Sequence, residues 1–511
     1  MNKIYIACLS VMLLFYSCNE SFLNLNPESS STEASFYKTE DHFNQAINAA
    51  YASMRTIINI GYIVGEMRSD NTHYTRNNNE RMDSNSFRED VANFLVTSQN
   101  YTVSELWSGC YNTIAQANTI LARLDATDLS DTFKNRIIGQ AKFMRAWAYF
   151  ELVQCYARIP IQLTEVKTAD QAFPVQSTPE EVYAVIIDDV KDAIDKLETV
   201  EFPQDGSATK GAAKMLYAYV LMTKPSPDYS TAESQLDDVI NKMGYDLLPH
   251  YADVFDTSKK NSVEHIFSVQ YQMGNQGQES NWLYLFMPRT KEGELITGVE
   301  FSNTTSTGGW NVPTQAMIDS YEPNDLRLDP SVGIAVGTIE NDALVVANVF
   351  KVGDPRINNY ETALPFVNKY RHTHTNIFNT DDNWPVYRYS DALLLMAECL
   401  VDQNRGAEAV PFVNRVRTRA GLPSVSVVTA DVVANERKHE LAFENHRWFD
   451  LVRTGKAIDV MTADGAYIKS IDKDVSSRAY NVKKENLILP IPYRELRINK
   501  NLTQNPGSEP Q

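Results

Sequence analysis

One stretch of the chain, residues 433–455, brings together the side chains that are best suited to do chemistry. Its sequence, VANERKHELAFENHRWFDLVRTG, sets charges among bulky apolar groups, and the charged residues of interest are Arg437, Glu440, Glu444, Arg447 and Asp450. Carboxylates beside guanidinium groups can act as acids and bases, or they can hold one another as ion pairs. Because charges between packed helices are costly unless they are paired, we expect these five residues to pair and favour a structural role.

Two helices are needed to position these charged groups. Residues at steps of four and three form one helical stripe, which consists of Arg437, Leu441, Glu444, Trp448 and Leu451. Asn445 tolerates the left-handed backbone conformation that ends helices. We therefore predict one helix up to Glu444, a corner at Asn445–His446, and a second helix over 447–453 that is closed by Gly455.

This stretch resembles the C-terminal signature of the SusD-like (RagB/SusD) family of outer-membrane nutrient-binding lipoproteins of Bacteroidota. The family pattern is roughly E-R-R-x-E-L-x-F-E-G-x-R-W-x-D-L-x-R-x-G, matched here by Glu436, Arg437, Glu440, Leu441, Phe443, Glu444, Arg447, Trp448, Asp450, Leu451, Arg453 and Gly455. Lys438 replaces an Arg of the pattern, and Asn445 replaces its corner Gly. Further family-like segments are residues 22–29, 141–161, 308–327, 384–398 and 487–507, so the resemblance covers essentially the whole mature chain.

No catalytic motif stands out elsewhere in the sequence. The chain lacks G-x-S-x-G, H-E-x-x-H, a Walker loop and G-x-G-x-x-G. Two carboxylates suffice for a glycosidase, so 65 acidic residues leave that chemistry formally open. The net charge of −18 argues against a nucleic-acid partner, for which a basic face is needed. The family resemblance implies a binding protein rather than an enzyme, and no cofactor or metal is expected.

Sugar binding would require exposed aromatic faces beside amide, carboxylate or Arg groups. Trp107, Trp147 and Trp448 lie in periodic helical patterns, and Trp384 precedes a family-typical helix, so these four are assigned to the core. Trp282 and Trp310 remain, both in irregular Gly-, Asn- and Thr-rich surroundings.

We therefore predict a ligand surface in which both of these rings take part, provided that the two irregular segments meet on one face. The full set of predicted ligand-binding residues is Asp70, Asn71, Tyr74, Trp282, Tyr284 and Trp310. The alternatives are that the two indole rings cover the helical core from outside and that the 60–101 loop is merely solvated.

The first residues read as a targeting segment. Lys3 precedes an apolar run over residues 4–15 that is too short to span a bilayer, and Cys18 follows it directly. We predict a signal peptide over 1–17 and lipidation of Cys18, with a plain secretory signal as the alternative. Cys110, Cys155 and Cys399 lie in apolar helical patterns without C-x-x-C spacing, which predicts buried free thiols.

Helical periodicity dominates much of the remaining chain. Roughly, residues 32–56, 103–243 and 388–420 are predicted to form degenerate tetratricopeptide-like helix pairs, with Thr178 and Pro179 starting one helix. Residues 60–101 and 245–383 are predicted to be loop-rich and to face the ligand. The fold class expected is mainly α: a single SusD-like domain over 18–511, in which helix pairs pack against a loop-rich part with few short strands.

The family resemblance implies a function as well. It implies a lipid-anchored protein at the surface of the outer membrane that captures an oligo- or polysaccharide and hands it to a SusC-like TonB-dependent transporter. Two alternatives remain open: a surface enzyme that cleaves glycans, and a peptide- or protein-binding scaffold of the tetratricopeptide kind.

Overall fold

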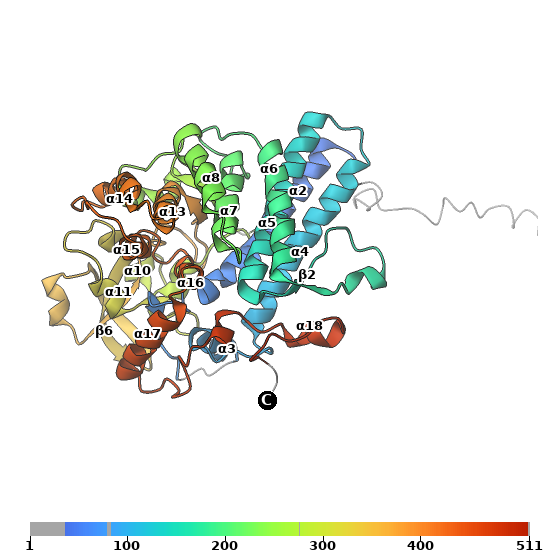
Figure 1. The fold of residues 1–511 in the computed structure, drawn as a ribbon. Helices are drawn as coiled ribbons and strands as arrows, with labels where there is room; N and C mark the ends of the chain where they lie inside the picture. Colours follow the sequence, from blue (N-terminus) through green and yellow to red (C-terminus); the bar gives the residue numbers. More distant parts are fainter. Residues whose placement is uncertain (1–35, 79–82, 275, 509–511) are drawn as a thin grey trace, which may run out of the picture.

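The structure is a computed structural model that describes residues 36–78, 83–274 and 276–508. The predicted signal peptide and Cys18 lie outside the described residues. The fold is mainly helical with short strands, as predicted (Figure 1). No helix within the described ranges is both long enough and apolar enough to cross a membrane.

The N-terminal half is built from long helices that pack side by side. They are α2 (Glu40–Gly65), α4 (Tyr101–Asp125), α5 (Asp131–Tyr156), α6 (Pro179–Lys196), α7 (Lys210–Thr223) and α8 (Tyr229–Lys242), with the shorter α3 (Asp83–Ala92) beside α2 and α4. The start of α6 is the predicted one, because the Thr178 hydroxyl accepts from the Glu181 N–H and Pro179 is the first helical residue. Successive helices contact each other from α4 to α8, which is the arrangement expected of stacked helix pairs.

The C-terminal part contains further helices, some of which extend this stack. They are α13 (Tyr389–Asp402), α14 (Gly406–Arg419), α15 (Ala430–Glu440), α16 (Arg447–Arg453), α17 (Ala457–Ile471) and α18 (Tyr493–Ile498). Helix α13 packs against α8, α14 and α15, so the end of the chain continues the helical layer (Figure 1). Buried Leu and Ala side chains of α13 form part of the same apolar core as α2, α4, α5 and α7.

Short strands and short helices make up the part between α8 and α13, and a few more lie elsewhere in the chain. The strands pair antiparallel as β1 (Thr72–His73) with β5 (Val312–Pro313), β2 (Ile159–Pro160) with β3 (Gln176–Ser177), β4 (His265–Val269) with β9 (Trp384–Arg388), and β6 (Val332–Glu340) between β7 (Ala343–Lys351) and β8 (Thr362–Val367). The short helices are α9 (Trp282–Phe286), α10 (Glu294–Thr297), α11 (Gln315–Asp319), α12 (Leu328–Ser331) and the 3-10 turns η2 (Ala169–Ala172), η3 (Tyr251–Val254), η4 (Thr257–Lys259), η5 (Pro355–Asn359) and η6 (Lys484–Leu487).

The two helices of the 433–455 stretch differ from the prediction at one boundary. Helix α16 spans the predicted residues, and Gly455 follows it with a left-handed φ of +72°. Helix α15, however, ends at Glu440 rather than Glu444. The reason is that the left-handed conformation occurs twice, at Phe443 (φ +66°) as well as at Asn445 (φ +69°), so the corner is longer than one Asn suggested.

The cysteines and the helical tryptophans occupy the places that the periodicity predicted. Cys110, Cys155 and Cys399 are buried free thiols. Trp107, Trp147, Trp384 and Trp448 are all buried as well, and the first three belong to the main apolar core.

Candidate functional site

The aromatic side chains predicted to face a ligand are buried. The solvent-exposed fraction is 0% for Trp282 and Tyr284, 2% for Trp310 and 5% for Tyr74. The premise that these rings offer open faces is therefore wrong, and the alternative that they cover the core describes them correctly. Trp282 and Trp310 lie in irregular backbone, but irregular backbone does not prevent a side chain from being buried against helices.

Trp282 lies at the centre of an aromatic cluster. Its ring centroid lies 4.6 Å from that of Tyr271, 4.9 Å from Trp384 and 5.5 Å from Tyr370. Tyr271 and Tyr370 lie within the 245–383 region and Trp384 begins β9, so Trp282 ties that region to β9. Tyr284 points elsewhere and contributes its hydroxyl to a 2.7 Å hydrogen bond with His374.

The two irregular segments of the prediction do meet in space. Strands β1 and β5 pair Thr72 with Pro313 and His73 with Val312, and the ring centroids of Tyr74 and Trp310 lie 5.9 Å apart. Trp282 does not join this pair, because it belongs to the separate cluster described above. The contact between the segments is thus a packed junction with two buried rings, and it leaves no stacking face on either ring.

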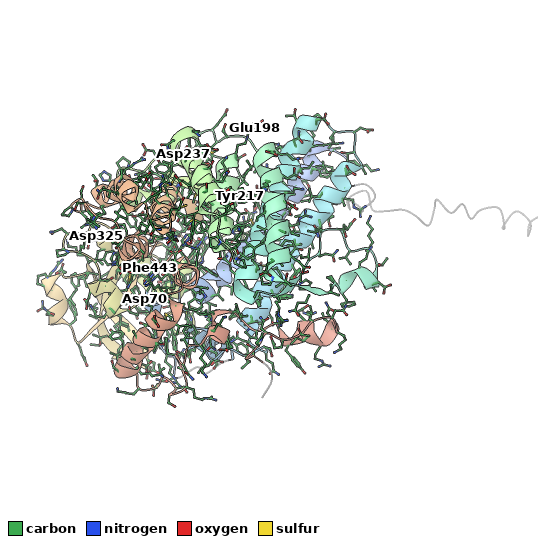
Figure 2. All side chains as sticks on the ribbon, in the orientation of Figure 1. Asp70, Glu198, Tyr217, Asp237, Asp325 and Phe443 are labelled. Atoms are coloured by element: carbon green, nitrogen blue, oxygen red, sulfur yellow. The ribbon has the colours of Figure 1, made fainter. Side chains whose placement is uncertain are left out.

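Asp70 and Asn71 are also engaged within the protein. The Asp70 carboxylate accepts from Arg447 at 2.7 Å and from Lys438 at 2.9 Å. Figure 2 labels Asp70. Burial alone would raise the pKa of Asp70, but these two cations outweigh burial and hold the pKa well below its usual range. The Asn71 amide donates to Glu66 at 2.7 Å. These two residues therefore fasten the 66–71 turn to the 433–455 stretch.

The charged residues of that stretch are paired, as predicted, but mostly with partners from elsewhere. Within the stretch, Arg437 donates to Asp450 at 2.8 Å. Glu444 accepts from Lys369 and from Arg388, each at 2.7 Å, and Arg388 also donates to Glu440 at 3.0 Å. The network joins β9, α15 and the loop before α16, and its members are buried and fully engaged, which is the signature of a structural ion-pair cluster.

An open aromatic face is found in the same segment as Trp310, at a residue that the sequence analysis did not select. Phe301 is 87% exposed, the highest fraction among the large apolar side chains described. Its backbone has a left-handed φ of +57°, which is unfavourable for a bulky residue and is common at functional positions. Phe301 lies in a Gly-, Asn- and Thr-rich stretch, and this composition was the available signal for it.

Hydrogen bonds on both sides hold the Phe301 loop in a defined shape. Gly293 N–H donates to the Ser302 carbonyl at 2.8 Å, and the side chains of Thr297 and Ser302 are 2.9 Å apart. Thr304 N–H donates to the Thr290 carbonyl at 2.8 Å. The loop is therefore ordered before any ligand arrives, and the aromatic ring at its tip stands in solvent.

The groups that flank Phe301 suit hydroxyl-rich ligands. Glu300 and Asn303 are exposed and lie near Phe301 in the sequence, so they offer a carboxylate and an amide N–H beside it; the Asn303 amide oxygen accepts from Thr305. The loop also reaches the predicted 60–101 region, because the Asn77 amide donates to the Thr305 carbonyl at 3.3 Å. We define residues 300–305, with Thr75 and Asn77 beside them, as the loop surface.

A second candidate is a cleft of about 600 Å³ between α4, the 160–174 segment and α18. Its walls are largely apolar, with exposed Val166, Phe173 and Ile498 at the rim. The polar groups in its wall are used internally, since Asn118 donates to the Gln162 carbonyl and Tyr111 donates to the Pro160 carbonyl. A hydroxyl-rich ligand would find few free partners there, so the loop surface is the better candidate for sugar binding.

Two models of known protein families match the chain. Residues 263–507 match the SusD family, and residues 21–220 match a family described as "Starch-binding associating with outer membrane". Two SusD-like proteins of Formosa agariphila are 27% identical to this chain over 536 and 542 residues, with at least 97% of each chain covered. A SusD-like protein of Bacteroides ovatus is 25% identical over 475 residues, covering 86% of this chain and 80% of its own.

Solved structures agree with this assignment. A structure described as "Laminarin binding SusD-like protein" superposes with a TM-score of 0.74 at 25% identity and covers 92% of this chain and all of its own. Surface glycan-binding protein A from Bacteroides thetaiotaomicron, in complex with laminarihexaose, has the same fold, with a TM-score of 0.71 at 21% identity, covering 91% of this chain and 99% of its own. The fold defines a SusD-like protein of the mainly helical kind, and the chain belongs to the SusD family.

Proposed function

We propose that this protein captures a glycan at the loop surface, with Phe301 as the platform on which a sugar ring stacks. The observation that carries the proposal is a nearly fully exposed aromatic ring, on a loop ordered by hydrogen bonds, in a chain of the SusD family. Stacking buries the apolar face of a pyranose against the ring, while Glu300 and Asn303 are placed to accept and donate hydrogen bonds to hydroxyl groups.

The test is a comparison of glycan binding by two variants. Laminarin is the first probe, because a related protein is described as binding it, followed by an array of other polysaccharides. Phe301→Ala is expected to weaken binding about fivefold, since one stacked ring contributes on the order of 1 kcal/mol. Val427→Ala is the matched control: Val427 is a 67% exposed apolar residue in the segment between α14 and α15, outside the loop surface. Equal affinity of both variants and the parent chain would refute the site.

We further propose that the protein is anchored through Cys18 at the outer membrane and delivers its glycan to a SusC-like TonB-dependent transporter. Family membership and the apolar run that ends at Cys18 support this proposal. Co-purification from membranes with a TonB-dependent transporter encoded beside this protein would support it. Recovery of the protein alone, under conditions that preserve such complexes, would count against the delivery step.

The buried carboxylates of the 433–455 stretch favour a protein that binds a glycan without cleaving it. Glu440 and Glu444 are occupied by Arg and Lys donors and are buried away from the surface, so they cannot reach a glycosidic bond. Release of reducing ends from laminarin by the purified protein would favour the enzyme alternative. Binding of peptides but not of glycans would favour the tetratricopeptide-scaffold alternative.

A further inference from the structure

A small cavity lies where the helical repeats meet the C-terminal part of the chain. Its volume is about 80 Å³, and it is lined by residues of α2, α4, α5, α7, β9 and α16 and of the corner before α16. A cavity of this size has room for several water molecules, or for a ligand group of about five heavy atoms. The partly exposed residues Glu151, Gln154 and Phe449 form its opening.

Aromatic rings line one part of the cavity wall, and aliphatic side chains of α2 and α4 line another part. Trp147 and Phe150 come from α5, Tyr219 from α7, and Trp384 and Tyr387 from β9. The rings of Tyr219 and Tyr387 stack with centroids 5.6 Å apart, so they form one continuous wall. The faces of aromatic rings carry negative electrostatic potential, which attracts cations more than it attracts neutral or anionic groups.

Glu151 is the one acidic side chain at the opening, and its carboxylate has no hydrogen-bond or ion-pair partner within the described part of the chain. Two other charged residues of α5 are paired: Arg145 donates to Asp189 at 2.7 Å, and Lys142 contacts Asp189 and Asp192. Burial raises the pKa of Glu151 to about 7, because no neighbouring cation compensates for the lost hydration. A cation in the cavity would provide that compensation.

The remaining charged groups around the cavity do not oppose a cation. Glu444 is neutralised by Lys369 and Arg388, which lie behind it. Burial lowers the pKa of His446 below its usual value, so this ring is neutral at pH 7. Asn445 adds a buried amide oxygen that has no partner among the described residues. The lining thus combines ring faces, a free carboxylate and an amide oxygen, with no uncompensated positive charge.

We propose that this cavity binds a small organic ammonium group, such as the amine of an amino sugar or the end of a lysine side chain. The ammonium would lie against the faces of the aromatic rings with its N–H groups directed to Glu151. The proposal does not depend on glycan capture at Phe301, because the cavity and the loop surface share no residue.

The test uses ethylammonium chloride and tetramethylammonium chloride as probes of the full folded protein, with sodium chloride and glucose as controls. Trp147 and Trp384 line the cavity, so intrinsic fluorescence and calorimetry both report binding. Saturable binding of an ammonium ion is expected, with no response to glucose or to sodium at equal ionic strength. Glu151→Gln should weaken binding at least about tenfold, because a charged hydrogen-bond acceptor is lost.

The matched control is Glu198→Gln, which removes the same charge from an exposed position after α6, far from α16 (Figure 2). This variant should bind the ammonium ions like the parent chain. Absence of binding, equal binding to Glu151→Gln, or equal binding of glucose would overturn the proposal. Should Glu151→Gln fail to fold, carbon-13 NMR of the parent chain decides: one glutamate carboxyl signal must move on addition of ammonium, and unmoved signals refute the site.

Discussion

Replacing Trp282 by Ala should destabilise the protein without touching its ligand surface. The Trp282 ring is fully buried against Tyr271, Tyr370 and Trp384. Removing a buried Trp side chain costs about 3–5 kcal/mol through lost transfer energy and the cavity left behind. The buried indole N–H of Trp282 has no acceptor among the described residues. Removing an unsatisfied buried donor is favourable and offsets part of the destabilisation. We therefore expect a loss near the lower limit, about 3 kcal/mol.

The size of the chain sets the shift in melting temperature that this loss produces. An unfolding entropy of about 2.1 cal/mol/K per residue amounts to roughly 1 kcal/mol/K for this chain, so the melting temperature should fall by about 3 °C. Far-UV circular dichroism is the suitable assay, because it follows the helices and does not depend on tryptophan emission. Trp282→Phe keeps one aromatic ring and removes the orphan donor, so its loss should be smaller than that of the Ala variant.

Phe301→Ala should have the opposite effect to Trp282→Ala: it should weaken glycan binding and leave the stability of the protein nearly unchanged. Since the Phe301 side chain stands in solvent, its removal should change the unfolding free energy by less than about 0.5 kcal/mol while weakening glycan binding. Trp282→Ala, measured below its melting temperature, should bind glycan like the parent chain. A Trp282→Ala protein that melts normally but no longer binds would refute this reasoning, because it would place that ring at the ligand.

Three further predictions concern the ion network, acid stability and the anchor. Glu444→Gln leaves Lys369 and Arg388 short of a buried counter-charge, so urea unfolding should show a loss of unfolding free energy of about 3–5 kcal/mol. The control Arg405→Ala removes a partly exposed ion pair and should lose less than about 1 kcal/mol. Similar losses in the two variants would contradict a buried network. Neighbouring cations outweigh burial and hold the pKa values of Asp70 and Glu440 below their usual range. The two carboxylates therefore stabilise the folded protein fully above about pH 4, and this stabilisation is lost as the pH falls through the folded pKa values. The melting temperature should therefore drop below pH 4, and Asp70→Asn should show a shallower drop; an unchanged slope would argue against this pair. Cys18→Ala should release the protein from the membrane fraction on immunoblots, and retention there would exclude Cys18 as the anchor.

Much of the fold could be predicted from local sequence, because helix formation depends on near neighbours. Thr178 and Pro179 start α6 as expected, and the helical periodicity assigned Trp107 and Trp147 to the core correctly. The 433–455 stretch was sufficient to suggest the family, and its charged residues are paired. The one misplaced boundary, the end of α15, reflects the left-handed backbone at Phe443, which residue type alone does not reveal.

The candidate site could be located only to a region. Two aromatic residues nine positions apart, Phe301 and Trp310, share the same Gly-, Asn- and Thr-rich composition, yet one is exposed and the other is buried. Their difference arises from β1–β5 pairing, which brings residues some 240 positions apart into register and packs Trp310 against Tyr74. Side-chain exposure is a property of such long-range contacts, so the sequence by itself determined the helices, the family and the charged cluster. Only the tertiary structure decided which aromatic ring faces the solvent and that the Glu151 carboxylate is left without a partner among the described residues.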